Sequence, residues 1–292
     1  MTVKDAVLTT PVTASPRAAR SPARATRARV IIGGALLAVV VVVTIAAPQF
    51  APYDPEAYDL LAMLQPPSTA HPFGTDELGR DVLSRVIWGG RPVLLVTVVA
   101  TLLSLVIGVL LGFLAASGTV ANVILSRVAD IQLSIPGLVF ALLAIALTGN
   151  HVANIIVVLA LASWPLHFRV VRAHALSVRG LPFAEASRLA GSSPWYRATR
   201  NFLPGVVPLI AVTTSVTATV VALSATGLSY LGLGVVMADW GRMIATSKGH
   251  LSDALWASGF PALALVIFLF SIQLLADAIA DRSAPEIERS RA

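Results

Sequence analysis

Residues 92–116 read PVLLVTVVATLLSLVIGVLLGFLAA, a run without a single charged side chain. A helix needs about 20 apolar residues to cross the hydrocarbon core of a bilayer. The run therefore predicts a membrane-spanning helix. Four further uncharged stretches of similar or greater length lie around it: residues 30–53, 131–169 (without the charged last residue), 201–238 and 254–276.

The two longest stretches decide how many spans to expect. Residues 131–169 can cross twice at about 1.5 Å per residue, and the sequence TGNH at 148–151 indicates a turn between the crossings. Residues 201–238 are equally long, but Gly227, Gly232 and Gly234 crowd their second half. We expect one span there, over 209–226, followed by a glycine-rich outer segment. The prediction is an all-α, polytopic membrane protein with six transmembrane helices.

The composition supports a membrane protein. Mean hydropathy is +0.81, and 12% of residues are charged, where soluble domains carry about 25%. A soluble chain of this size could not bury so much apolar surface in one core. The absence of cysteine excludes disulfides and cysteine metal sites. The net charge of +6 raises the question of nucleic acid, but the cations lie in short runs between apolar stretches, so we expect no nucleic-acid partner.

The distribution of Lys and Arg predicts the orientation. With six spans, sixteen of these residues fall on the side of both termini and five on the other, which places both termini in the cytoplasm. A cleaved signal peptide is the alternative, but the apolar run at 30–47 exceeds the usual 7–15 residues. The expected organisation follows from these spans. It comprises a disordered basic cytoplasmic leader (1–29), a first transmembrane helix (30–47), an extracytoplasmic loop (48–91), a five-helix core (92–280) and a cytoplasmic tail (281–292).

The chain lacks the sequence motifs for ATP binding, ion coupling and hydrolysis. A phosphate loop of the form GxxxxGK[ST] is excluded, because neither Lys4 nor Lys248 is followed by Ser or Thr. Ion-coupled carriers usually keep ionisable groups within their spans. The spans of this chain are nearly free of them. Neither HExxH nor GxSxG occurs. We therefore expect no catalytic residue, no enzyme activity and no cofactor in this chain, and an energy source in another subunit.

The longest predicted cytoplasmic connection, residues 165–205, contains signals for the starts and ends of short helices. Residues 185–190 predict a short helix with small side chains on one face, and Gly191 permits a left-handed ending. Ser193 can cap a second helix that has Pro194 at its first position. A solvated helical hairpin explains this pattern as well as a docking surface does.

The same segment resembles a motif of ABC importer permeases. Glu185-Ala186-Ser187, Gly191 and Leu203-Pro204 are similar to "EAA…G…LP", with Ser187 and Asn201 as departures. The resemblance implies a coupling helix that docks on a cytoplasmic ATPase and transmits its ATP-driven closure to the spans. The residues that it assigns to ATPase coupling are Glu185, Ala186, Ser187, Gly191, Trp195, Leu203 and Pro204.

A longer match lies after the first span. Residues 71–85 read HPFGTDELGRDVLSR and resemble the "HPFGTDxxGRDxxSR" signature of the dipeptide/oligopeptide/nickel permeases, in their C-type subunit. Residues 127–136, 227–234 and 240–244 resemble the family's "RxxDxxLxxP", "GLSFLGLG" and "WGxMI". Ala225 departs from the family, since many relatives carry an acid there, and residues 273–283 match its C-terminal pattern only loosely.

Two roles remain open for the outer signature: ion pairs that fix the loop, or contact with a solute-binding protein. Its residues are His71, Gly74, Thr75, Asp76, Gly79, Arg80, Asp81 and Arg85. One His beside two carboxylates is weak support for a metal, so we predict no metal site. We expect Pro136 to kink the third span. The residues assigned to gating are Asp130, Pro136, Gly227 and Gly232.

The resemblance implies a type I ABC importer permease fold in a multi-pass protein of the cell membrane. The implied partners are a second homologous permease, two cytoplasmic ATPases that bind ATP and Mg, an extracytoplasmic solute-binding protein and the lipid bilayer. The implied substrates are di- and oligopeptides, with nickel or another small solute as the alternative. Two rival classes are an ATP-independent secondary transporter or channel and a membrane scaffold.

Overall fold

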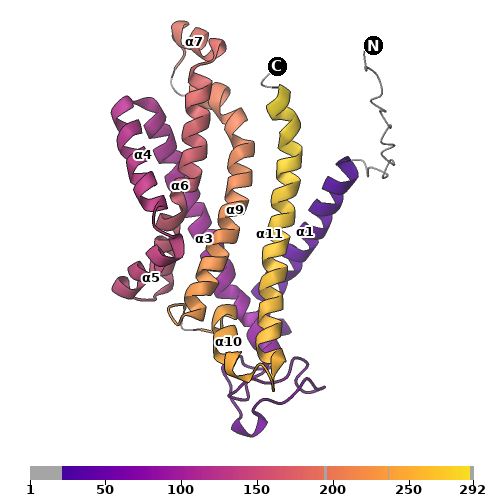
Figure 1. Ribbon diagram of the computed structural model, residues 1–292. Coiled ribbons are helices and arrows are strands. Elements are labelled where there is room, and N and C mark those ends of the chain that lie inside the picture. The colour runs from indigo at the N-terminus through magenta and orange to yellow at the C-terminus, as the bar shows by residue number, and fades with distance from the viewer. Residues whose placement is uncertain (1–21, 194–195, 236, 290–292) are drawn as a thin grey trace, which may run out of the picture.

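The computed structural model describes residues 22–193, 196–235 and 237–289, and most of them are helical (Figure 1). The first half contains α1 (Pro22–Ile45), α2 (Ala47–Phe50), η1 (Leu60–Ala62), α3 (Val82–Ser117), α4 (Thr119–Leu133) and α5 (Gly137–Thr148). The second half contains α6 (Val152–Arg179), α7 (Pro182–Leu189), η2 (Arg197–Phe202), α9 (Leu203–Tyr230), α10 (Trp240–Ser247), η3 (Lys248–His250) and α11 (Leu255–Arg289). The only β pairing among these described residues is an isolated bridge between Thr75 and Asp81.

Five helices are long and apolar enough to cross a membrane. They are Thr26–Ile45 within α1, Val82–Ser117, Val152–Arg179, Arg200–Tyr230 and Leu255–Asp281. A sixth crossing is available only as the pair α4 and α5, which meet at 88°. The all-α membrane fold predicted from the sequence is confirmed, but the third span, expected as one kinked helix, is broken into two.

The break lies at Pro136. Leu133 ends α4, Ser134 carries the last helical hydrogen bonds, and Pro136 adopts an extended ψ of 126° before α5 begins at Gly137. A proline removes a helical N–H and clashes with the preceding turn. The residue before it is pushed out of the helical region as well. A bend of 88° between two separate helices therefore replaces the expected kink within one helix.

Three predicted boundaries are corrected. Helix α3 begins at Val82, because the Asp81 carboxylate caps it, so the loop expected over 48–91 ends ten residues earlier. Helix α1 begins at Pro22, so residues 22–29 of the expected disordered leader are helical, while residues 1–21 lie outside the described chain. Helix α6 continues to Arg179, so residues 165–179 of the cytoplasmic segment expected over 165–205 are the end of this helix.

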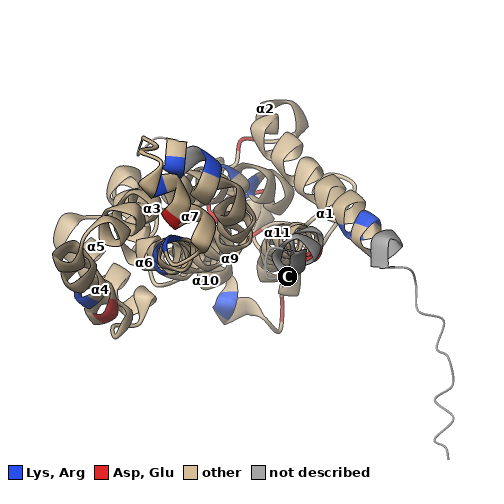
Figure 2. Ribbon diagram, turned by 90° about the horizontal axis from the view of Figure 1, so that it is seen from above, with Lys and Arg blue, Asp and Glu red and all other residues tan. Residues whose placement is uncertain are grey.

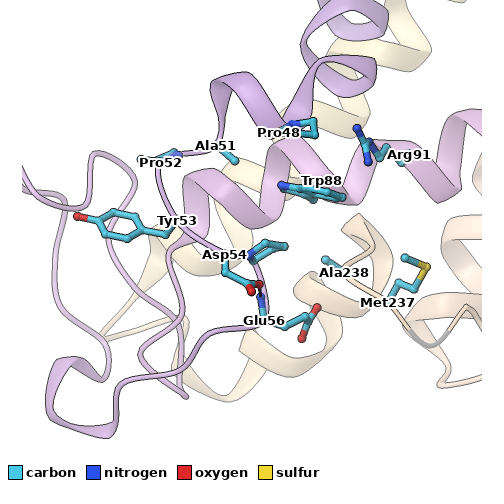
Figure 3. A pocket seen from close by; sticks show the side chains of 11 residues that line it. Pro48, Ala51, Pro52, Tyr53, Asp54, Glu56, Trp88, Arg91, Met237 and Ala238 are labelled. Carbon is cyan, nitrogen blue, oxygen red and sulfur yellow. Dashed lines mark hydrogen bonds between the residues drawn. The ribbon is translucent and has the colours of Figure 1, made fainter.

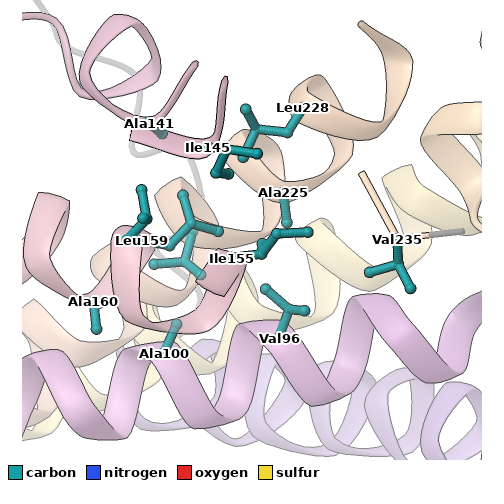
Figure 4. Packing of buried hydrophobic residues seen from close by; sticks show 12 residues of the cluster. Val96, Ala100, Ala141, Ile145, Ile155, Leu159, Ala160, Ala225, Leu228 and Val235 are labelled. Atoms are coloured by element: carbon teal, nitrogen blue, oxygen red, sulfur yellow. The ribbon is translucent and has the colours of Figure 1, made fainter. Parts of the chain in front are cut away.

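The pair α3 and α6 forms the centre of the bundle. A Cβ at Gly108 would lie 2.5 Å from the His167 Cβ, and one at Gly112 would lie 2.7 Å from the Val171 Cγ1. Only glycine permits this approach, which follows the small-residue packing of membrane helices. The main apolar cluster lies where α3, α5, α6 and α9 meet (Figure 4). Ala225 is buried in this cluster.

Helix α1 lies at the edge of the bundle, beside α11 and the start of α3 (Figure 1). Few of its described side chains are buried. Gly33 lets α11 approach, since a Cβ there would lie 2.8 Å from the Leu274 Cβ. Arg29 pairs with Asp281 at 2.6 Å, so this acid near the divergent C-terminus contacts α1.

The bundle has two distinct ends (Figure 1). Helix α7 and the end of α11 lie toward one end, and residues 51–81 and α10 lie at the other. Figure 2, which looks down from the α7 end, shows Lys and Arg near α7 and the ends of α3 and α6. The two sequence signatures therefore occupy opposite ends of the molecule.

Candidate functional site

The outer signature folds around the buried carboxylate of Asp76. Its Oδ1 accepts from the backbone N–H groups of Leu78 at 2.9 Å and Arg80 at 3.0 Å. Its Oδ2 accepts from the Arg80 Nε at 2.8 Å and lies 3.4 Å from the Arg85 Nε. The Arg85 guanidinium, 3% exposed, donates to the Pro55 carbonyl at 2.9 Å and reaches Glu56 at 3.4 Å. These ion pairs and hydrogen bonds hold residues 76–85 against residues 55–56 of the same chain.

Asp81 connects the loop to the first turn of α3. Its Oδ2 accepts from the backbone N–H of Ser84 at 2.8 Å and from the Ser84 hydroxyl at 2.7 Å. Its Oδ1 lies 2.9 Å from the His71 Nδ1. The His71 ring also lies against Tyr53, with ring centroids 4.9 Å apart. His71 therefore positions the capping acid. Among the described residues, no group of three His, Cys, Asp or Glu could hold a metal.

Thr75 and two glycines shape the turn itself. The Thr75 hydroxyl donates to the Ala62 carbonyl at 2.5 Å and accepts from the Gln65 N–H at 2.8 Å, and the Trp256 Nε1 donates to the Thr75 carbonyl at 3.1 Å. Gly74 and Gly79 both have φ of +71°, a conformation that glycine adopts readily. The sequence indicated the glycines and Thr75 but gave no signal for the contact with Trp256, which is 181 residues away.

A cavity of about 690 Å³ opens beside this loop (Figure 3). Residues 48–56 form one wall, and Trp88, Arg91 and residues 237–238 form the other. The Arg91 guanidinium lies 4.1 Å over the Trp88 ring and donates to the carbonyls of Thr44 and Ile45 at 3.0 and 2.8 Å. Arg91 thus satisfies the last carbonyls of α1, a role that its position at the edge of an apolar run did not reveal.

The glycine-rich segment packs α10 against the end of α9. Gly232 has φ of +82°, and a Cβ at Gly241 would lie 2.2 Å from the Thr226 carbonyl oxygen. Asp239 caps α10 by accepting from the Gly241 N–H at 2.8 Å. Burial raises the pKa of Asp239 to about 6, against hydrogen bonds from Gly241, Ser229 and Arg242 that lower it. Helix α10 is therefore close-packed against α9 at Gly241, whereas a Cβ at Gly232 would meet nothing within 4 Å. Gly227, the other glycine assigned to gating, faces Leu138 of α5.

The broken third span is held to α6 by polar contacts. The Trp164 Nε1 donates to the Gln132 Oε1 at 2.8 Å, and the Gln132 Nε2 donates to the Leu161 carbonyl. Asp130 pairs with Arg169 at 2.7 Å, with both side chains about half exposed. Asp130 thus contacts α6 near the α7 end, and Pro136 lies at the break. Gln132 and Trp164 were not identified from the sequence.

His167 is buried in the middle of the bundle. Its Nδ1 lies 3.2 Å from the Ser104 hydroxyl of α3, and its Nε2 lies 3.2 Å from the Thr214 hydroxyl of α9. One side chain of α6 therefore joins three helices by hydrogen bonds. An ionisable residue inside a long apolar stretch is the signal that could have identified it.

Helix α7 extends from the bundle with its surface uncovered. None of its residues, all of which the structure describes, is buried, and Leu189 is 79% exposed. Gly191 ends the helix with φ of +75°, as the sequence indicated. The Ser187 hydroxyl lies 2.6 Å from that of Ser192 and closes the turn. The Ser193 hydroxyl accepts from the Tyr196 N–H at 3.2 Å, which is the expected cap.

The remaining coupling residues lie after this turn. Trp195 falls outside the described residues, as does Pro194. Leu203 and Pro204 begin α9, directly after the π-helical turn η2. The structure therefore brings the described coupling residues together at one end, far from the outer signature.

A bundle of membrane-length helices, with an uncovered helix at one end and a loop fixed by ion pairs at the other, defines a polytopic membrane protein. A sequence profile described as "Binding-protein-dependent transport system inner membrane component" matches residues 108–289. A second profile, "N-terminal TM domain of oligopeptide transport permease C", matches residues 29–67. The chain belongs to the family of binding-protein-dependent transport system inner membrane components.

Individual relatives agree with this assignment. The chain is 34% identical over 259 residues to the "Probable D,D-dipeptide transport system permease protein" of Escherichia coli (strain K12), covering 88% of this chain and 87% of that one. It is 36% identical over 263 residues to a candidate peptide permease protein of Brucella suis, with the same coverage. The inward-facing MetNI methionine ABC transporter matches with a TM-score of 0.56 and 21% identity, over 69% of this chain and 97% of that one. The last likeness shows the type I ABC importer permease fold.

Proposed function

We propose that this chain forms half of a translocation path for di- or oligopeptides across the cell membrane, in a complex driven by separate ATPase subunits. The two relatives described above carry dipeptide or peptide permease names, which supports a peptide substrate. Neither name supports the nickel alternative. The partners in this proposal are a second permease, two ATPases that bind ATP and Mg, and an extracytoplasmic binding protein.

The exposed surface of α7 carries the proposal. Phe183 is 51% exposed and Leu189 is 79% exposed, although apolar side chains of this size favour burial. Ala186 lies between them and is exposed. A small side chain between two large apolar ones lets a partner backbone approach closely. In this proposal α7 docks on the ATPase and lies in the cytoplasm. The excess of Lys and Arg predicted for that side from the sequence supports this orientation.

Replacement of Ala186 by Trp tests the proposal. The side chain is exposed, so Trp leaves the fold of this chain unchanged but keeps the ATPase away from α7. We expect peptide uptake by cells that carry the complete transporter to fall at least about tenfold, the effect of losing roughly 1.4 kcal/mol of docking energy. Co-purified ATPase should fall in parallel.

Ala57→Leu provides the matched control. Ala57 is also exposed but lies in the outer loop, at the opposite end. This variant should keep its ATPase, and both variants should reach the membrane in wild-type amounts. Unchanged uptake and unchanged ATPase recovery in Ala186→Trp would contradict coupling through α7. Uptake by the purified chain without any ATPase would instead favour a secondary transporter.

Gly191 is a poorer position for such a test. Its φ of +75° strains any other residue. A bulky substitution there would disturb the end of α7 whether or not a partner docks on it. Ala186 separates the two effects, because it has ordinary helical geometry.

A further inference from the structure

A second cavity, of about 720 Å³, lies at the α7 end of the molecule. The C-terminal ends of α3 and α6, helix α7 and the turn η2 enclose it. One part of its wall is apolar and includes Phe113, Leu114 and Phe202. The other part carries the guanidinium groups of Arg179 and Arg197, together with Arg188 on α7. The cavity is therefore amphipathic.

The charged part of the wall is strongly cationic. Three arginines face one acid, Glu185, which lies 3.9 Å from Arg188 with both side chains more than 60% exposed. Each guanidinium has five N–H donors. Arg179 uses its Nη1 on the Ala116 carbonyl, and Arg197 uses its Nη1 on the Ser192 carbonyl at 2.5 Å. The wall thus combines positive charge with guanidinium N–H groups, which can donate two parallel hydrogen bonds to a phosphate.

A buried amide points to the same kind of ligand. Asn201 lines the cavity, and its Nδ2 has no accessible surface and no hydrogen-bond partner among the described groups. A buried donor without an acceptor costs stability. An oxygen atom of a ligand held by Arg197 would supply that acceptor after a small rotation of the amide.

The apolar wall selects a lipid over a free phosphate. Leu114 is 53% exposed and Leu110, one turn before it, is 63% exposed. They form an apolar track on α3 that ends at Ser117, where the membrane-length helix stops. An acyl chain can lie along this track while the headgroup reaches the arginines. Basic pockets at the cytoplasmic ends of membrane helices bind anionic headgroups in this way.

We propose that this cavity binds one anionic phospholipid of the cytoplasmic leaflet, with its phosphate held by Arg179, Arg197 and Asn201. Its acyl chains lie along Phe113 and Leu114. This lipid site rests on the proposed function in one respect only, namely that α7 lies on the cytoplasmic side of the membrane. Because α6, α7 and η2 all supply the wall, a bound lipid braces α7 against the bundle.

Native mass spectrometry of the full-length chain, delipidated in detergent, tests the proposal. Phosphatidylglycerol is titrated against phosphatidylcholine with the same acyl chains. We expect one phosphatidylglycerol to bind at least about tenfold more tightly, and Arg179→Gln/Arg197→Gln to remove this preference, because both lose charged donors. Arg127→Gln, at an exposed arginine outside the cavity, should keep it.

Three results would overturn the proposal: equal affinity for the two lipids, an unchanged preference in the double variant, or the same loss in Arg127→Gln. Competition by glycerol 3-phosphate at equal concentration would show a free-phosphate site and overturn the lipid assignment. A photoactivatable phosphatidylglycerol on the wild-type chain gives a readout independent of the variants. Labelling near Phe113 supports the site, and labelling only elsewhere contradicts it. Failure here leaves the Ala186→Trp experiment unaffected, so the two proposals fail separately.

Discussion

Gly79 occupies a position that a larger residue cannot take. Its φ is +71°, and a Cβ there would lie 1.8 Å from the Asp59 carbonyl oxygen. Backbone cannot move aside as a flexible side chain can, and the conformation itself is unfavourable for alanine. We expect Gly79→Ala to lower the free energy of unfolding by about 2–4 kcal/mol, measured by thermal or denaturant unfolding in detergent.

Gly249 is the matched control at the same end of the molecule. A Cβ there meets nothing within 4 Å, and its φ is not in the left-handed region. Gly249→Ala should change stability by less than about 0.5 kcal/mol. Equal stability of the two variants would show that the outer loop relaxes around Gly79 and is less rigid than its contacts indicate.

At the scale of elements, one side chain of α3 helps to attach the end of α1. Arg91 donates to the Thr44 and Ile45 carbonyls, the last of α1, and stacks on Trp88. We expect Arg91→Gln to destabilise the chain by about 1–3 kcal/mol, since charged hydrogen bonds to otherwise unpaired carbonyls are lost. The loss should appear as a lower unfolding temperature in detergent.

Arg127→Gln serves as the control for this prediction, because Arg127 is exposed on α4. Its replacement should leave the unfolding temperature within about 1 °C, as for most surface substitutions. A similar drop in both variants would mean that overall charge, and not the attachment of α1, determines the stability of the chain.

Sequence reasoning succeeded where a long apolar run alone decides the element. The run at 92–116 lies within α3 and the run at 152–169 lies within α6, because a helix satisfies its own backbone groups in lipid. It also found Gly74, Gly79 and Gly191, whose positive φ follows from turn chemistry. These features are local, so neighbouring residues contain the information.

It failed where a capping side chain or a distant group determines the structure. The start of α3 at Val82 depends on Asp81, a cap that hydropathy does not register. The 88° break at Pro136 is accompanied by Gln132 bonding to Trp164, 32 residues away. The contact of Trp256 with Thr75 and the bridge from His167 to α3 and α9 are likewise long-range. Pairings of this kind arise only from the packed structure.

At the scale of the whole molecule, the two ends should face different compartments. Ala57 and Ala190 are exposed at opposite ends, and the chain has no native cysteine. We expect a membrane-impermeant maleimide to label Ala57→Cys in intact spheroplasts. Ala190→Cys should be labelled only after solubilisation, because the excess of Lys and Arg keeps that end inside. Labelling of Ala190→Cys in intact spheroplasts would reverse the orientation and contradict the coupling proposal.

Helix α6 has a mechanical consequence for the whole complex. It runs without interruption over 28 residues, from Val152 to Arg179, a length of about 42 Å at 1.5 Å per residue. Three residues after it ends, α7 begins, and two residues before it starts, the Asn150 amide donates to the Gly234 carbonyl at 3.1 Å. Because α6 is continuous and is attached near both ends, we expect a displacement of α7 to move α6 as one unit and to reach Gly234 at the opposite end of the bundle.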